Sequence, residues 1–87
     1  TLGNSVTFTW SKGNIALTWR GVEITVGSGF QATTFEPVYS ADRLSATVDL
    51  SFAQNLGAPA GHLIYVSLYY FPLDAPYQVV NYTYIKG

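Results

Sequence analysis

Few side chains in this sequence have the chemistry that catalysis requires. His62 is the single histidine and no cysteine is present, so the usual His and Cys ligand sets for a transition metal are missing. Hydrolysis by a carboxylate pair needs two acidic groups close together, but the carboxylates stand apart along the chain: Glu23, Glu36, Asp42, Asp49 and Asp74. No nucleophile-elbow motif accompanies any serine. We therefore expect no enzymatic activity, no metal site and no cofactor.

The two tryptophans are candidates for ligand recognition. Flat indole rings stack on sugar rings, so Trp10 and Trp19 raise the hypothesis of a carbohydrate-binding surface. Both residues fall on the apolar positions of alternating segments, and large aromatic side chains in such positions are mostly buried. The pattern favours core packing for Trp10 and Trp19, with sugar binding as the alternative.

Four tyrosines form a second candidate surface. Tyr65 and Tyr69 alternate with the apolar residues of segment 64–68, so they are expected to point away from the core. Tyr82 and Tyr84 in the next segment are expected to join them in one patch of rings and hydroxyl groups. Tyrosine is frequent at recognition surfaces because it offers contact area with few rotatable bonds and a hydrogen-bonding tip. The alternative is that a second layer of the protein covers this face.

The sequence carries little charge. Only 10% of its residues are charged, against roughly 25% in an average soluble domain, and the formal net charge is −1. Copies of such a chain repel one another weakly, so self-association is expected. The cations are too few and too scattered to neutralise a run of phosphates, which argues against nucleic acid as a partner. No apolar run approaches the roughly 20 residues of a membrane-spanning helix.

Alternating apolar residues at the start of the chain predict a β-hairpin. The segments 6–10 and 15–19 flank the turn signal Lys12-Gly13, and a two-residue loop there places the large apolar side chains of both strands on one face. The expected cross-strand pairs are Trp10 with Ile15, Phe8 with Leu17 and Val6 with Trp19.

The apolar positions change from odd to even numbers after Trp19. Val22, Ile24 and Val26 continue the pattern on the other face, and Gly21 suits a β-bulge or a corner at the change. Gly27 to Gly29 then reads as a turn.

The rest of the chain predicts further strands. Segment 43–52 alternates cleanly, which indicates a half-buried strand, and segment 62–71 is apolar at nearly every position, which indicates a central strand covered on both faces. Segment 77–85 is the last predicted strand. Pro37 favours an edge strand or a loop, residues 54–61 and 72–76 read as a loop and a turn, and 53–56 as at most a short helical turn.

These predictions give an all-β fold in a single domain over residues 1–87. We expect a small antiparallel β-sandwich of six to seven strands, immunoglobulin-like in size, with a partly open barrel as the second choice. The expected function is a structural or assembly module of an extracellular filament, surface layer or virion, whose partners are further copies or another surface protein. The alternative is a carbohydrate-binding module that holds polysaccharide through Tyr65, Tyr69, Tyr82, Tyr84, Trp10 and Trp19.

Overall fold

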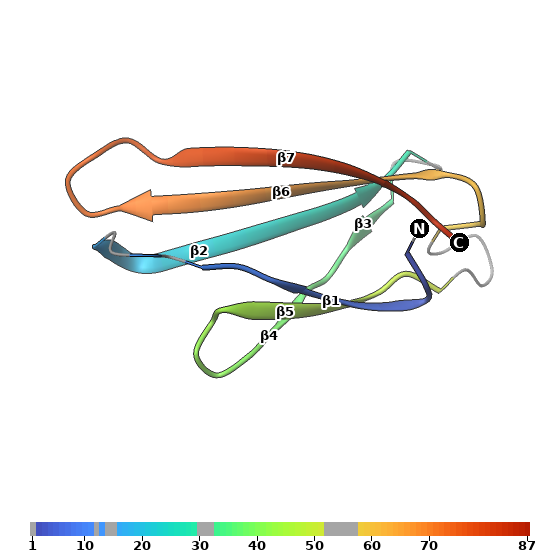
Figure 1. Ribbon diagram of the computed structural model, residues 1–87, viewed down its shortest axis with the longest axis horizontal. Coiled ribbons are helices and arrows are strands. Elements are labelled where there is room, and N and C mark those ends of the chain that lie inside the picture. Colours follow the sequence, from blue (N-terminus) through green and yellow to red (C-terminus); the bar gives the residue numbers. More distant parts are fainter. Residues whose placement is uncertain (1, 12, 14–15, 30–32, 52–57) are drawn as a thin grey trace.

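The chain folds into two antiparallel β-sheets that pack face to face as a small sandwich (Figure 1). The computed structural model describes residues 2–11, 13, 16–29, 33–51 and 58–87. One sheet has the order β1-β5-β4 and the other the order β3-β2-β6-β7. Their strands are β1 (Ser5–Thr9), β2 (Leu17–Ser28), β3 (Thr34–Phe35), β4 (Val38–Tyr39), β5 (Ser45–Asp49), β6 (Leu63–Pro72) and β7 (Gln78–Ile85). The all-β sandwich predicted from the sequence is therefore confirmed.

The core forms where the alternating apolar residues of the two sheets meet. In β2 and β6 the even-numbered residues point inward, so Ile24 and Val66 are buried, and β5 contributes Ala46 and Val48 from the opposite sheet. Leu50, just after β5, has no exposed surface and belongs to the same cluster. Because period-two alternation sends these side chains to one face, the sequence pattern directly specifies the buried set.

The predicted exchange of faces in the second segment is confirmed as a β-bulge. The register between β2 and β6 shifts between Leu17 and Val22, and Gly21 has a φ of 64°. Glycine adopts this left-handed conformation without the clash that a Cβ would cause. The bulge moves the inward positions from odd to even numbers and also turns Trp19 out of the alternation.

The predicted hairpin between segments 6–10 and 15–19 is wrong. β1 pairs with β5, with Val6 opposite Val48 and Phe8 opposite Ala46, while β2 pairs with β6 in the other sheet. Two strands that each have one apolar face satisfy the same alternation whether they pair within a sheet or face each other across the core. The pattern alone did not distinguish these arrangements. The proposed pair of Trp10 with Ile15 lies outside the described residues.

The later strands follow the sequence pattern more closely. β5 and β7 lie within their predicted segments. β6 runs one residue past its predicted end, because Pro72, which was predicted to lie in the turn, is its last residue, whereas Pro76 does lie in the turn. β6 is interior to its sheet, but it is covered on one face only, since Tyr65 is 48% exposed. Pro37 lies between the two-residue edge strands β3 and β4, as its lack of an N–H favours. β2 continues through Gly27 and Ser28, where a turn was predicted.

Two smaller predictions fall in part or wholly on residues that are not described. They are the short turn at 53–56 and the end of the strand at Phe52. Of the predicted loop 54–61, the described residues 58–61 lie outside any strand. The described part of the chain contains no apolar helix of the length that a bilayer crossing requires.

Candidate functional site

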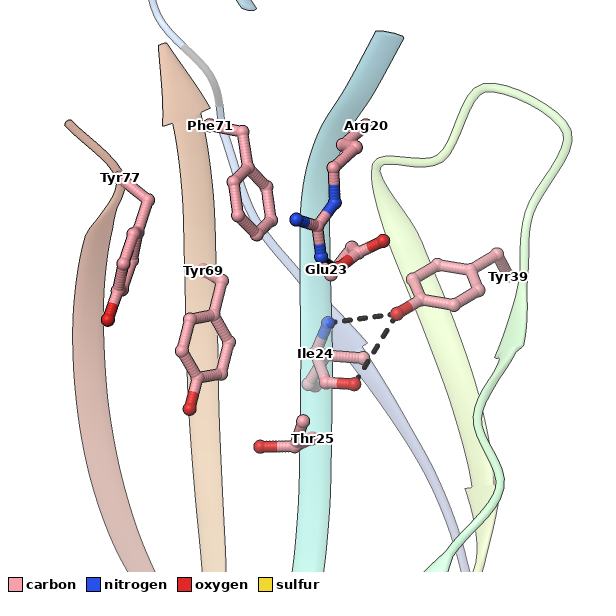
Figure 2. A pocket seen from close by; sticks show the side chains of 8 residues that line it. All are labelled: Arg20, Glu23, Ile24, Thr25, Tyr39, Tyr69, Phe71 and Tyr77. Carbon is pink, nitrogen blue, oxygen red and sulfur yellow. Dashed lines mark hydrogen bonds and ion pairs between the residues drawn. The ribbon is translucent and has the colours of Figure 1, made fainter. Parts of the chain in front are cut away.

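The outward face of the sheet β3-β2-β6-β7 carries a cluster of aromatic rings, and no second layer of the described residues covers it. Odd-numbered residues of β6 point to this face, and Tyr69 and Phe71 stand two residues apart with nearly parallel rings, 6.5 Å between centroids. Tyr77, just before β7, lies 6.0 Å from each of the two rings. Figure 2 shows the three rings gathered over β6 and the neighbouring end of β7. Such a cluster concentrates apolar contact area at one end of this sheet face.

An ion pair from β2 borders the aromatic cluster. The Arg20 guanidinium donates to the Glu23 carboxylate at 2.6 Å and lies 3.9 Å from the centroid of the Phe71 ring. Arg20 sits at the β-bulge, and Glu23 is the first outward residue after it, so the bulge brings the two charges to the same place. The ring and the carboxylate together hold the guanidinium in a fixed position beside the cluster.

Two open clefts meet at this cluster. The first, of about 420 Å³, lies over β2 and β6 and is lined by Tyr69, Phe71, Tyr77, Arg20, Glu23, Ile24, Thr25 and Tyr39. The second, of about 460 Å³, is lined by Phe71, Tyr77, Arg20, Thr18, Trp19, Pro72, Leu73 and Ala75. Because both clefts share Arg20, Phe71 and Tyr77, we treat them as one surface and call it the aromatic groove.

Trp19 forms one end of the aromatic groove. Its side chain is 92% exposed, which is unusual for the largest apolar residue of a small protein. The core position predicted for Trp19 is therefore wrong, because the bulge beside it removes it from the inward face. Trp10 does pack against the core, with its ring edge-on to Tyr39 and its Nε1 donating to the Arg43 carbonyl at 3.0 Å.

The four predicted tyrosines do not form one patch. The register pairs Ile64 with Tyr84 and Val66 with Tyr82, so Tyr82 and Tyr84 point to the inward side of the sheet. Tyr65 and Tyr69 point outward as predicted, but only Tyr69 lines the aromatic groove. The expectation of a common face is thus wrong, because it assumed that odd residues of β6 stand opposite even residues of β7.

The second notable surface is strand β7 itself. All of its residues except Tyr84 are exposed, including apolar side chains on both faces: Val79 and Ile85 outward, Val80 and Tyr82 inward. β7 is the last strand of its sheet and runs along the rim of the molecule (Figure 1). Val80 and Tyr82 are 42% and 43% exposed, so the described residues of the opposite sheet cover them only in part.

The titratable groups of the described residues have local roles. The Ser40 hydroxyl and the Leu44 backbone N–H donate to Asp42 and hold the pKa of this carboxyl below its usual value. Ser51 lowers the pKa of Asp49 in the same way. His62 is exposed beside β6. Within the described ranges, no group of three or more His, Asp or Glu side chains is arranged to hold a metal ion.

The chain matches no family model, no curated protein and no solved structure. The candidate surfaces must therefore be interpreted from their own geometry.

Sequence reasoning missed several residues of the aromatic groove: Arg20, Glu23, Phe71 and Tyr77. Phe71 has the same parity as Tyr65 and Tyr69, so the alternation of segment 62–71 already contained the signal for it. Tyr77 could have been found by continuing the β6 register through the turn. Arg20 and Glu23 meet only because of the bulge, whose geometry a charge pattern does not reveal.

Proposed function

We propose that this chain is a non-enzymatic assembly module, a subunit or appended domain of an extracellular filament, surface layer or virion that acts through protein–protein contacts. The observation that supports this most is the open edge of β7. An exposed, long and uncharged edge strand is a template for another strand, and natural sheets usually protect such edges with charge, proline or a bulge. No charged residue occurs between Ala75 and Ile85.

The backbone groups available on this edge can be identified from the hydrogen bonds at its end. Ile85 C=O and Gly87 N–H bond to Leu2 on the outer side, while Lys86 N–H and C=O bond to the His62 and Gly61 side. The backbone groups of successive residues in a strand point to alternate sides. The N–H and C=O groups of Val79, Asn81 and Thr83 therefore point away from β6, toward the open side of β7. Among the described residues, no strand pairs with them.

We propose that the partner strand is β7 of a second copy of this chain. If two β7 strands pair antiparallel about a two-fold axis at Asn81, Val79 of one copy stands opposite Thr83 of the other. Every backbone N–H and C=O group of Val79, Asn81 and Thr83 then has a hydrogen-bonding partner in the second copy. An axis at Val80 would place Thr83 opposite Tyr77, which lies before the strand begins, and would leave backbone groups of Thr83 unpaired. An axis at Tyr82 would place Val79 opposite Ile85, whose carbonyl is already bonded to Leu2. A self-complementary interface of this type is the usual basis of homodimers.

The side chains of β7 agree with this register. On the inward side, Val80 of one copy stands opposite Tyr82 of the other, and aromatic and β-branched residues form favourable cross-strand pairs. Val80 and Tyr82 are 42% and 43% exposed in the single chain, so pairing removes apolar surface from water. No like charges meet, since the strand has none.

The test is the mass of the protein in solution, measured by size-exclusion chromatography with light scattering across the micromolar range. We expect a dimer for the parent chain. Asn81→Pro removes an N–H that has no partner among the described residues. It also places the proline ring on the edge where the second strand would pair, and a proline there is compatible only with a strand that has no neighbour on that side. This variant is expected to be a folded monomer.

Asn81→Val is the matched control, because it also loses the Asn81 bond to the Ser67 hydroxyl but keeps the backbone N–H. It is expected to remain a dimer. A parent chain that is strictly monomeric at every concentration would overturn the proposal. A dimer that persists in folded Asn81→Pro would overturn the role of β7.

A further inference from the structure

The aromatic groove lies on the outward sheet face, and the residues whose backbone groups the proposed pairing uses, Val79, Asn81 and Thr83, line neither of its clefts. Tyr69, Phe71 and Tyr77 form one group of neighbouring rings, and Trp19 lines the second cleft together with Phe71 and Tyr77. Each cleft has the volume of a ligand site, about 300–1,000 Å³. Two such clefts in a row suit an elongated ligand better than a compact one.

The polar groups of the groove are grouped along one side of the rings. Glu23 offers carboxylate oxygens, Arg20 offers a planar set of N–H donors, and Thr25 offers a hydroxyl group. The side chains of Arg20 and Glu23 are 45% and 34% exposed, so a ligand can reach them while their mutual bond holds them in position. Apolar faces next to fixed donors and acceptors are the combination that a ring with C–H faces and hydroxyl edges requires.

We infer that the aromatic groove binds a neutral polysaccharide, with Trp19 and Tyr77 stacking on sugar rings and Glu23 and Arg20 bonding to their hydroxyl groups. This inference goes beyond the proposed assembly and does not depend on it. Sugars expose flat C–H faces that pack on aromatic rings, and carboxylate and guanidinium groups can each bond to two neighbouring hydroxyls.

The charge of the groove selects among ligand classes. Arg20 is the single cation that lines either cleft and it is paired with Glu23, so the groove as described has no net charge. Nucleic acids and acidic glycans need unpaired cations for tight binding. An acyl chain would cover the remaining donors and acceptors of Arg20 and Glu23, and the hydroxyl of Thr25, without bonding to them. An uncharged, hydroxyl-rich chain satisfies both the rings and the polar side.

The experiment is retention of the full chain on insoluble polysaccharides. The neutral probes are microcrystalline cellulose, chitin, starch granules and insoluble β-1,3-glucan, and polygalacturonate is the acidic probe. We expect retention on at least one neutral probe. Trp19→Ala and Tyr77→Ala are each expected to weaken that binding by about tenfold or more, as loss of a central aromatic contact does. Both residues are well exposed, so neither change should unfold the chain.

Tyr65→Ala is the matched control, because Tyr65 is an exposed tyrosine on the same sheet face, in the strand that carries Tyr69 and Phe71, but lines neither cleft. It is expected to bind like the parent chain. Retention on none of the neutral probes, or on polygalacturonate alone, would overturn the inference. Equal losses in Tyr65→Ala and Trp19→Ala would also overturn it, by showing that the apolar face adheres without a defined site. The dimeric parent chain and the monomeric Asn81→Pro variant are expected to be retained equally. Polysaccharide binding can then be judged independently of the assembly test.

Discussion

The two edges of the four-stranded sheet differ in how far their backbone groups are paired. On the β2 side, β3 pairs with Val26 and Gly27, and beyond β3 the Tyr39 hydroxyl accepts the Ile24 N–H at 2.9 Å. The bulge at Gly21 then ends the regular edge. On the β7 side, a single contact with Leu2 at the end of the strand is the pairing that the described residues provide. One edge is closed by a short strand, a side chain and a bulge, and on the other edge the described residues leave most of β7 unpaired.

This difference has a consequence for assembly. Short edge strands, bulges and side-chain caps are the devices by which sheets avoid pairing with other sheets. If only the β7 edge of this sheet accepts a strand, pairing about a two-fold axis closes at two copies. Growth of a filament or layer then requires a further surface besides the β7 edge.

The largest expected effect tests whether β7 lies outside the core. Leu68 and Val80 stand opposite each other in the β6–β7 ladder, but Leu68 is 8% exposed and Val80 is 42% exposed. Leu68→Ala should lower the free energy of unfolding by about 2–5 kcal/mol. Val80→Ala should lower it by less than about 1 kcal/mol in the monomer. Chemical denaturation, with both changes made in the monomeric Asn81→Pro background, measures the difference.

Equal losses for the two variants would contradict the open-edge description, because they would mean that Val80 is covered in solution. In the dimeric parent chain, Val80→Ala should cost more than in the monomer, since the proposed register packs Val80 against Tyr82 of the second copy. That additional loss would link the stability measurement to the assembly.

The next effect concerns the closed edge. Tyr39→Phe keeps the ring that packs against Trp10 but removes the oxygen that accepts the Ile24 N–H. Because Ile24 is buried, we expect a loss of about 1–3 kcal/mol in the free energy of unfolding, the usual cost of leaving a buried donor unpaired. Tyr82→Phe is the control, since its ring is exposed on the open edge. A loss in Tyr82→Phe as large as that in Tyr39→Phe would mean that the cap is not what protects β2.

The strands were predictable to the extent that alternation specifies them. Segments 43–52 and 77–85 each contain an observed strand, segment 62–71 matches β6 to within one residue at either end, and the change of parity after Trp19 correctly indicated a bulge near Gly21. These features depend on the local order of side chains along one strand. Local order is what a period-two pattern records.

Partner choice was not predictable in the same way. The pattern of segments 6–10 and 15–19 fits a hairpin as well as two facing sheets, and the second arrangement is the real one. The error at Trp19 followed from it, because a hairpin places Trp19 opposite Val6 in the core. The capping contact between Tyr39 and Ile24 joins the two sheets, and the spacing of these residues in the sequence does not predict it.

A smaller effect is expected at the bulge. Gly21 has a φ of 64°, and an added Cβ meets no atom within 4 Å, so the cost of a side chain there is one of backbone conformation alone. Gly21→Ala should lower the free energy of unfolding by about 1 kcal/mol. Gly21→Asn should lower it less, because asparagine tolerates the left-handed region better. Thermal unfolding of both variants measures this, and equal losses would argue that the bulge has another conformation in solution.

The smallest effect is a pH dependence in the turn between β4 and β5, on the closed side of the molecule. The bonds from Ser40 and Leu44 lower the pKa of Asp42 in the folded chain, so the unfolded chain binds the proton more readily. The stability that Asp42 contributes is therefore complete above the unfolded pKa of about 3.9 and is lost as the pH falls through the lower, folded value. Asp42→Asn should flatten the stability profile below about pH 4, whereas Asp74→Asn, in the turn beside the open edge, removes the same charge without these bonds and serves as the control. Chemical denaturation between pH 2 and 6 (roughly the range over which carboxylates titrate) would detect it, and an unchanged acid slope in Asp42→Asn would show that these bonds do not persist in solution.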